Sequence, residues 1–226
     1  MNGEEMDVLV TAGDVELEGT LGIPDQPRGV VLFAHGSGSS RFSPRNRYVA
    51  RILRDHGLAT LLIDLLTTQE EEIDLVTRHL RFNIRLLAER LVGAVDWLTG
   101  DERTRHLAVG TFGSSTGAAA ALVAAAARPL VVRAVVSRGG RPDLAGDALS
   151  QVRAPTLLLV GGRDEPVIEL NEEAKARMHA PCELRIIPGA THLFEEPGTL
   201  EQVASQAAAF FAEHLGAATQ PAEAGI

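Results

Sequence analysis

The stretch GSSTG, residues 113–117, fits the pattern G-x-S-x-G with Ser115 at its centre. Glycines on either side of such a serine let a strand and the following helix approach closely, while the serine takes a strained turn that exposes its Oγ. The motif therefore indicates a nucleophile at the end of a strand. A second interpretation is open at this point, because a serine can also cap the alanine-rich helix that follows by accepting a backbone N–H bond.

A serine hydroxyl becomes a strong nucleophile only when a base takes its proton and a third group orients that base. Two later segments supply these residue types: Asp164 follows an apolar run in LLVGGRDEPV, and His192 follows another in IIPGATHLF. Singly, His192 could be an ordinary loop residue and Asp164 a helix cap before Pro166. The order Ser115, Asp164, His192 is that of a triad opened by a nucleophile turn, and we predict this triad. Asp143 is the reserve candidate for the acid.

The segment AHGSGSS, residues 34–40, is suited to presenting backbone N–H groups to a negative charge. Acyl transfer needs such donors for its tetrahedral oxyanion. We expect the backbone N–H groups of Ser37 and Thr116 to form this oxyanion hole, and His35 to brace the loop. A phosphate-binding loop is disfavoured, because the segment fits neither G-x-G-x-x-G nor the Walker pattern.

Two arginines are candidates for binding a carboxylate on a substrate. Arg41 follows the glycine-rich segment, and Arg138 ends an apolar run in VVSRGG. Arginine recognises carboxylates through two parallel N–H donors. For both residues the alternative is an ordinary salt bridge at the edge of the sheet.

These residues need a scaffold that brings strand ends together. Residues 15–24 alternate between apolar and polar side chains, which is typical of an antiparallel strand with one exposed face. Continuous apolar runs, typical of buried parallel strands, cover 29–36, 59–66, 106–113, 132–140, 155–164 and 183–192. Helical patterns cover 45–56, 80–98, 115–127, 168–178 and 200–215. This alternation predicts an α/β fold, a mostly parallel sheet with helices on both faces.

Ligands bind such sheets beyond the carboxyl ends of the strands, so all the candidate residues are expected at one edge. We predict one domain over residues 1–216 and a disordered tail over 217–226. The stretch TTQEEEID, residues 67–74, is predicted to be an acidic surface loop. Only residues 138–154 separate two strands where a cap would be inserted, so no large cap domain is expected.

Composition narrows the class of partner. The formal net charge is −9 with no basic cluster, which argues against nucleic acid and anionic membranes. No apolar run approaches the roughly 18 residues of a membrane span, and the start MNGEEMDVLV lacks the layout of a signal peptide. The single cysteine, Cys182, excludes an internal disulfide, and the histidines show no metal-ligand spacing. We expect a cytoplasmic protein without metal or cofactor, and the oligomeric state is left open.

Taken in this order, AHGSGSS, GSSTG, LVGGRDEPV and PGATHLF resemble the motifs of the α/β-hydrolase superfamily, in its branch of dienelactone-hydrolase-like small serine esterases. The resemblance runs from about Val15 to Leu215. Two further phrases, SPRNRYVA and SRGGRPDLAG, resemble a subgroup that is sometimes fused to a phosphoribosyltransferase domain. Dienelactone hydrolases proper have cysteine at the turn where this chain has Ser115. The resemblance therefore implies general ester hydrolysis more than a dienelactone substrate.

The resulting expectation is a serine hydrolase that cleaves small carboxylic esters through an acyl-enzyme and prefers short acyl chains. Two alternatives belong to other classes of activity. One is a non-catalytic ligand-binding module of the same fold, and the other is an amidase or thioesterase.

Overall fold

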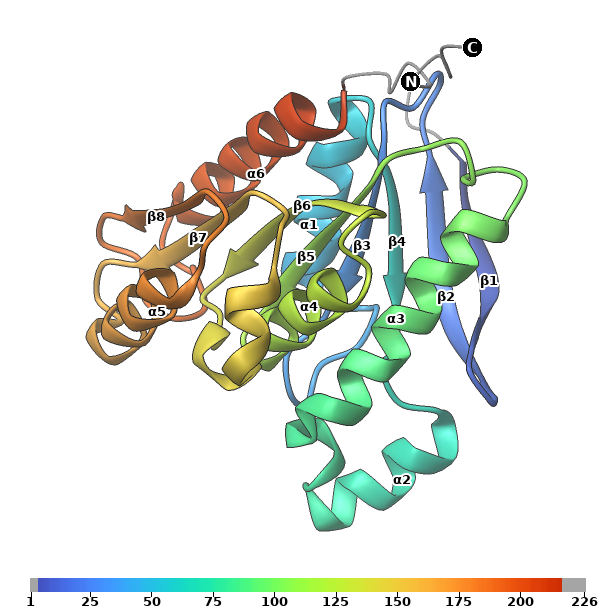
Figure 1. The fold of residues 1–226 in the computed structure, drawn as a ribbon, viewed down its shortest axis with the longest axis horizontal. Coiled ribbons are helices and arrows are strands. Elements are labelled where there is room, and N and C mark those ends of the chain that lie inside the picture. Colours follow the sequence, from blue (N-terminus) through green and yellow to red (C-terminus); the bar gives the residue numbers. More distant parts are fainter. Residues whose placement is uncertain (1–3, 217–226) are drawn as a thin grey trace, which may run out of the picture.

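The computed structural model describes residues 4–216, in which one eight-stranded sheet lies between two layers of helices (Figure 1). The strands are β1 (Glu4–Ala12), β2 (Val15–Ile23), β3 (Val30–Ala34), β4 (Ala59–Ile63), β5 (Val109–Ser114), β6 (Val132–Arg138), β7 (Thr156–Gly161) and β8 (Cys182–Ile187). The helices are α1 (Pro44–Asp55), α2 (Thr68–Thr77), α3 (Ile84–Gly100), α4 (Thr116–Ala127), α5 (Glu165–Arg177) and α6 (Thr199–Leu215). Two 3₁₀ segments are η1 (Leu80–Phe82) and η2 (Pro142–Gln151).

The strand order is β1-β2-β4-β3-β5-β6-β7-β8. The pairs β1–β2 and β2–β4 are antiparallel, and all other neighbouring strands are parallel. The carboxyl ends of β3 to β8 therefore share one edge, where ligands bind in sheets of this kind. The predicted α/β fold with a mostly parallel sheet and helices on both faces is confirmed.

Each face of the sheet has its own apolar core. Helices α1 and α6 cover one face, and α3, α4 and α5 cover the other (Figure 1). Helix α4 packs against α3, η2 and strands β5 and β6, and nine of its residues are buried. A helix that is apolar all round belongs in a core. Its alanines let it approach the sheet closely, which brings its first turn to the edge of the sheet.

The first strand, β1, was missed by the sequence patterns. It pairs with β2 through a two-residue turn, Gly13-Asp14, in which Gly13 has a φ of +65°. Glycine at the first central position suits the type II′ turn that joins antiparallel strands. The dipeptide Gly-Asp between two alternating stretches was the available signal for this hairpin.

The prediction of an acidic loop over residues 67–74 is wrong, because most of it lies in helix α2. Thr67 and Glu70 form a capping box: Thr67 Oγ1 accepts from the Glu70 N–H at 3.2 Å, and Glu70 Oε2 accepts from the Thr67 N–H at 2.8 Å. Acidic residues in a first turn also interact favourably with the helix dipole. The large apolar side chains of the helix are mostly exposed, which hid its periodicity: Ile73, Leu75 and Val76.

The predicted helix over 80–98 is divided in the structure into η1 and α3. Asn83 separates the two and caps α3, since its side chain accepts from the Leu86 N–H at 3.1 Å. Asparagine is favoured at the start of a helix because its side chain can hydrogen-bond to a nearby backbone N–H group. The other predicted helices begin and end within a few residues of α1, α4, α5 and α6.

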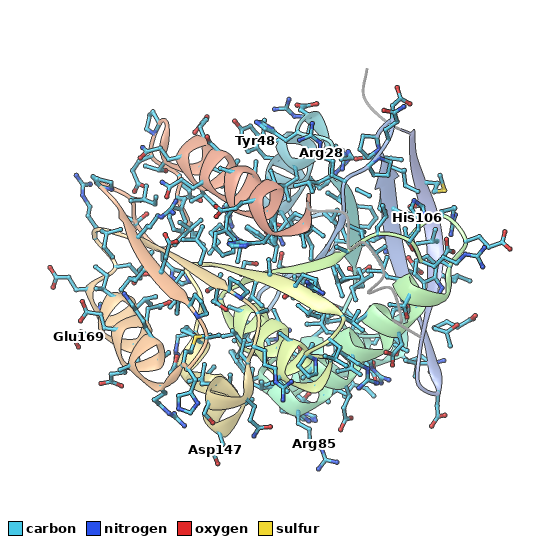
Figure 2. The ribbon with its side chains drawn as sticks, turned by 45° about the horizontal axis from the view of Figure 1, so that its top comes forward. Arg28, Tyr48, Arg85, His106, Asp147 and Glu169 are labelled. Carbon is cyan, nitrogen blue, oxygen red and sulfur yellow. The ribbon has the colours of Figure 1, made fainter. Side chains whose placement is uncertain are left out.

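Charged side chains point outward from the layer formed by α3, η2 and α5, as Arg85, Asp147 and Glu169 do in Figure 2. Within residues 4–216, no helix is long and apolar enough to cross a bilayer. The single domain over 1–216 stays a prediction, and the tail predicted for 217–226 lies outside the described residues.

Candidate active site

Ser115 lies on the turn between β5 and α4 with φ +50° and ψ −125°, a strained backbone conformation for a residue with a Cβ. A Cβ at Gly113 would lie 2.7 Å from the Ala118 nitrogen, and one at Gly117 would lie 2.5 Å from the His35 carbonyl oxygen. Both glycines are therefore required by the close contact of strand and helix. Ser115 occupies the N-cap position of α4, yet its side chain makes no capping hydrogen bond. This geometry favours the nucleophile over the cap.

Asp164 and His192 are brought together from two different loops. Asp164 lies between β7 and α5, His192 follows β8, and His192 Nδ1 is 2.6 Å from Asp164 Oδ2. Asp164 is at the N-cap position of α5 but makes no side-chain cap bond, so its carboxylate serves the imidazole. A carboxylate on Nδ1 fixes the tautomer that leaves Nε2 free to accept a proton.

The loop that carries His192 reaches back from β8 to the end of β6, the strand beside β5 and Ser115. A Cβ at Gly139, the residue after β6, would lie 3.7 Å from His192 Cε1, and the Arg138 carbonyl accepts from the Ser115 N–H at 3.4 Å. Within the described residues, no hydrogen bond joins Ser115 Oγ to the imidazole of His192. Such bonds often tighten only once substrate is bound.

The reserve acid, Asp143, is engaged elsewhere. Its carboxylate pairs with the guanidinium of Arg141, with Nε–Oδ1 and Nη2–Oδ2 distances of 2.9 and 2.8 Å. Of the two candidate acids, Asp164 is therefore the one that contacts His192.

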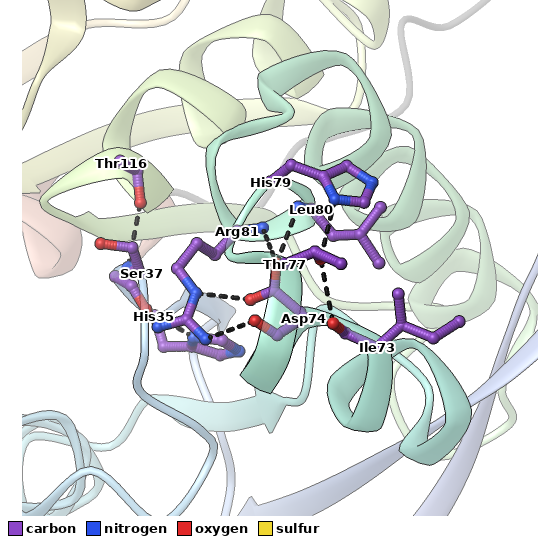
Figure 3. A network of polar contacts seen from close by, with 10 residues as sticks. His35, Ser37, Ile73, Asp74, Thr77, His79, Leu80, Arg81 and Thr116 are labelled. Atoms are coloured by element: carbon purple, nitrogen blue, oxygen red, sulfur yellow. Dashed lines mark hydrogen bonds and ion pairs between the residues drawn. The ribbon is translucent and has the colours of Figure 1, made fainter.

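The glycine-rich segment after β3 runs beside the nucleophile. A Cβ at Gly36 would lie 3.0 Å from Ser115 Cβ, so this segment passes in direct contact with the turn. The Ser37 N–H donates to Thr116 Oγ1 at 3.0 Å, as Figure 3 shows. Both predicted oxyanion donors thus lie at the site, but the N–H of Ser37 already has an acceptor.

His35 fixes the glycine-rich segment through hydrogen bonds at both of its ring nitrogens. Its Nδ1 is 2.9 Å from the Gly36 carbonyl oxygen, and its Nε2 accepts from the Leu65 N–H at 3.1 Å. Burial lowers the pKa of His35, which keeps the imidazole neutral as these two bonds require. The expected bracing role of His35 agrees with these contacts.

The α2–η1 region supports the same segment from outside and was missed in the sequence. The buried Asp74 carboxylate accepts from the Leu80 N–H at 2.7 Å and from Arg81 Nε at 2.5 Å (Figure 3). The guanidinium of Arg81 extends to the loop, with Nη1 3.0 Å from the position of a Cβ on Gly38. No local pattern links residues 36–39 with 74–81, so sequence could not reveal this contact.

The two candidate arginines differ in their partners. Arg41 is paired with two carboxylates, Asp64 and, at 2.7 Å from Nη2, Glu18. Arg138 is only 8% exposed, and its Nη2 donates to the neutral Asn46 Oδ1 at 3.4 Å. Burial and the nearby Arg45 lower the pKa of Arg138 to about 10.

Arg138 also has donors that remain unused. Its Nε and Nη1 have no hydrogen-bond partner among residues 4–216, and its guanidinium carbon lies 6.0 Å from the centre of the Phe194 ring. Phe194 belongs to the loop that carries His192. Of the two arginines, Arg138 is the one whose charge has no carboxylate partner in the described part of the chain.

The family model of the dienelactone hydrolase family matches residues 17–216. The chain belongs to this family. A solved dienelactone hydrolase from Anabaena variabilis is 63% identical, with a TM-score of 0.94 over 95% of this chain and 100% of that one. The α/β-hydrolase fold follows from this membership, and the family is named for a hydrolase. An esterase from Pyrococcus furiosus has the same fold at 20% identity, with a TM-score of 0.72 over 95% of this chain and 94% of that one.

A longer relative carries a different name. A Mycobacterium tuberculosis protein whose name proposes phosphoribosyl transferase activity is 59% identical over 209 residues, which are 92% of this chain and 46% of that protein. The chain therefore spans about half the length of the curated relatives it matches. The resemblance to a subgroup sometimes fused to a phosphoribosyltransferase domain agrees with this match.

Proposed function

We propose that this chain is a serine hydrolase that cleaves small carboxylic esters through an acyl-enzyme. The observation that carries the proposal is the 2.6 Å contact between His192 Nδ1 and the Asp164 carboxylate, together with the strained turn at Ser115. The side chain of Ser115 makes no capping hydrogen bond there. The family name supports it, because a lactone is a cyclic ester. Serine replaces the cysteine of dienelactone hydrolases proper, so we assign a general ester substrate.

The reaction would run in two halves. Ser115 Oγ attacks the ester carbonyl as His192 takes its proton, and Asp164 stabilises the imidazolium that forms. The tetrahedral intermediate expels the alkoxide, which receives the proton from His192. Water then attacks the acyl-enzyme by the same steps, and Ser115 regains its proton. These side chains complete the cycle without a cofactor, and we propose a cytoplasmic enzyme.

A fluorophosphonate probe tests the proposal directly. Wild type should be labelled covalently at Ser115, and Ser115→Ala should not be labelled. Ser114→Ala is the matched control, because the neighbouring Ser114 is buried and its Oγ donates to the Ala34 carbonyl at 3.4 Å. A wild-type protein that resists the probe and hydrolyses no ester would instead be the non-catalytic binding module.

Amidase and thioesterase activity are the alternatives within the fold. Comparing kcat/KM for an acetyl ester, a thioester and an anilide on one preparation distinguishes them, and we expect the ester to be fastest.

We propose a preference for short acyl chains, because the segment between β6 and β7 is only the 3₁₀ segment η2 and offers no apolar lid. Each methylene buried in a pocket would contribute about 0.8 kcal/mol, and an open site gains little of this. Exposed apolar side chains could change this outcome, among them those of α2 and of Leu144 and Leu193. Among p-nitrophenyl esters from C2 to C16, kcat/KM should peak at or below C4; a peak at C10 or longer contradicts the proposal.

Arg138 is the residue we propose for a substrate carboxylate, since Arg41 is already paired. Arg138→Met should raise KM for an ester that carries a carboxylate more than KM for its neutral methyl analogue. Equal changes for both esters would assign Arg138 to structure alone.

The transferase name of the longer relatives does not enter this proposal. The residues at the carboxyl edge of the sheet support acyl transfer, and this chain matches less than half of those proteins.

A further inference from the structure

The hydroxyl of Thr116 occupies a place where the proposed mechanism needs an N–H donor. The Ser37 N–H donates to Thr116 Oγ1 at 3.0 Å, so that N–H is not free to reach an oxyanion (Figure 3). Thr116 is only 5% exposed, and its hydroxyl proton has no acceptor among the described residues. A donor without an acceptor therefore lies beside the nucleophile.

Thr116 is held in this position by its surroundings. It is the first residue of α4, and Gly117 packs against the carbonyl groups of Ala34 and His35, which fixes the start of the helix. A β-branched side chain has few χ1 choices in a helix. Turning the hydroxyl away would leave the Ser37 N–H without its partner in a crowded turn, which is unfavourable for a buried donor. The contact is therefore expected to persist when substrate binds.

The backbone N–H of Thr116 has a different use. The first N–H groups of a helix have no intrahelical acceptor, and this one directly follows the nucleophile. Thr116 thus carries two donors, its backbone N–H and its hydroxyl, in the residue that directly follows the nucleophile, and the hydroxyl contacts the glycine-rich segment at Ser37.

We infer that the Thr116 hydroxyl is itself an oxyanion donor and that the Ser37 N–H donates to this hydroxyl and not to the oxyanion. This inference rests on the proposed ester hydrolysis. When Ser115 Oγ bonds to the carbonyl carbon, the π pair moves to the carbonyl oxygen, and Thr116 N–H and Oγ1–H donate to that oxygen. No proton is transferred along this path. When the C–O bond to the leaving group breaks, the carbonyl re-forms and the two hydrogen bonds weaken.

The Ser37 N–H strengthens this donor from a distance. A hydroxyl that accepts one hydrogen bond becomes a better donor of the next, because the bonds polarise each other. The negative charge is then shared over a chain that runs from the oxyanion through Thr116 Oγ1 to Ser37. His35 and Arg81 contribute by holding the backbone of that loop in place.

Two variants of one residue separate this role from a packing role. Thr116→Val keeps the shape and removes the hydroxyl, whereas Thr116→Ser keeps the hydroxyl and removes the methyl group. For p-nitrophenyl acetate, Thr116→Val should lower kcat by about 10²–10³ with little change in KM, as loss of one oxyanion donor does. Thr116→Ser should stay within a few-fold of wild type, and its labelling rate at Ser115 by a fluorophosphonate should exceed that of Thr116→Val.

The opposite result is equally clear. If Thr116→Val keeps kcat within about threefold of wild type or raises it, the Ser37 N–H contacts the oxyanion directly and the inference is wrong. Circular dichroism and urea unfolding check that the variants fold; if Thr116→Val does not, the same comparison is made between Thr116→Ala and Thr116→Ser. Wild-type labelling separates the two claims, since an unlabelled, inactive wild type overturns the proposed function and this inference together.

Discussion

Two loops at the carboxyl edge of the sheet each present a histidine, and they use its nitrogens differently. Both ring nitrogens of His35 are hydrogen-bonded to backbone groups, and the residue is 9% exposed. His192 has one nitrogen on Asp164, its side chain is 40% exposed, and its Nε2 has no partner within residues 4–216. A histidine can exchange protons with a substrate only through a free nitrogen, so the loop of His192 suits catalysis and that of His35 suits support.

The difference agrees with the prediction, made from the order of residues in the chain, that His192 and not His35 is the base. A loop directly after β3 must carry the backbone that faces the nucleophile, and a buried neutral imidazole stabilises such backbone by bonding on both sides. A loop after the edge strand β8 is more open. Its histidine needs one partner to set its orientation and must keep the other nitrogen free.

The largest expected effect concerns the loop of His192. Ser115→Ala and His192→Ala should each lower kcat for ester hydrolysis by roughly four to six orders of magnitude, because neither residue acts without the other. The double variant should be little worse than either single one. Steady-state kinetics on all three variants provides the measurement, and losses that add in the double variant would mean that the two residues act independently.

The next effect sharpens the role of the carboxylate beside His192. Asp164→Asn removes the group that orients the imidazole and stabilises its charge, so kcat should fall by about 10³–10⁴. Asp143→Asn is the matched control, since Asp143 is paired with Arg141, and it should keep nearly full activity. Near-full activity in Asp164→Asn with loss in Asp143→Asn would show that the acid is misplaced.

His192 is expected to matter more for activity, whereas His35 is expected to matter more for the free energy of unfolding. His35→Ala leaves the Leu65 N–H and the Gly36 carbonyl without partners, which should lower the free energy of unfolding by about 2–4 kcal/mol. His192→Ala removes an exposed side chain and should change it by less than about 0.5–1 kcal/mol. Urea unfolding monitored by circular dichroism gives both values, and equal losses would remove the distinction drawn between the loops.

The smallest effect depends on pH and follows from the lowered pKa of buried His35. The unfolded chain takes up a proton near pH 6.5, whereas the folded chain resists it until lower pH, so stability is full above that value and declines below it. The slope should be at most about 1.4 kcal/mol per pH unit. The stability advantage of wild type over His35→Ala should therefore shrink between pH 6.5 and 5, and an advantage that is constant over this range would contradict the buried neutral state.

The sequence was informative wherever backbone contact dictates residue type. A Cβ on Gly113 would clash with Ala118, and a Cβ on Gly117 would clash with the carbonyl groups of Ala34 and His35. The spacing of these two glycines therefore predicted the turn at Ser115. The order of strand ends likewise predicted that Asp164 and His192 would meet. These features depend on local geometry and on the order of elements in the chain.

Contacts between distant side chains could not be predicted in this way. Arg41 pairs with Glu18 because strand β2, at the antiparallel side of the sheet, folds against it. Thr116 Oγ1 accepts from the Ser37 N–H because the glycine-rich segment folds against the start of α4. Helix α2 was missed because its apolar side chains face solvent and leave no buried stripe to detect. Its capping box, Thr67 with Glu70, was present in the sequence and is the stronger signal.

The alanine content of α4 has a consequence for the rigidity of the nucleophile. Fixing a long side chain in one rotamer costs up to about 2 kcal/mol of conformational entropy, and alanine has no rotamer to lose. The helix TGAAAALVAAAA therefore becomes ordered at very little cost in side-chain entropy, and apart from Leu122 and Val123 it packs mainly through backbone and methyl contacts. Ser115 is attached to an element with few alternative packings, so thermal motion that repacks other helices should leave the direction of its Oγ nearly unchanged.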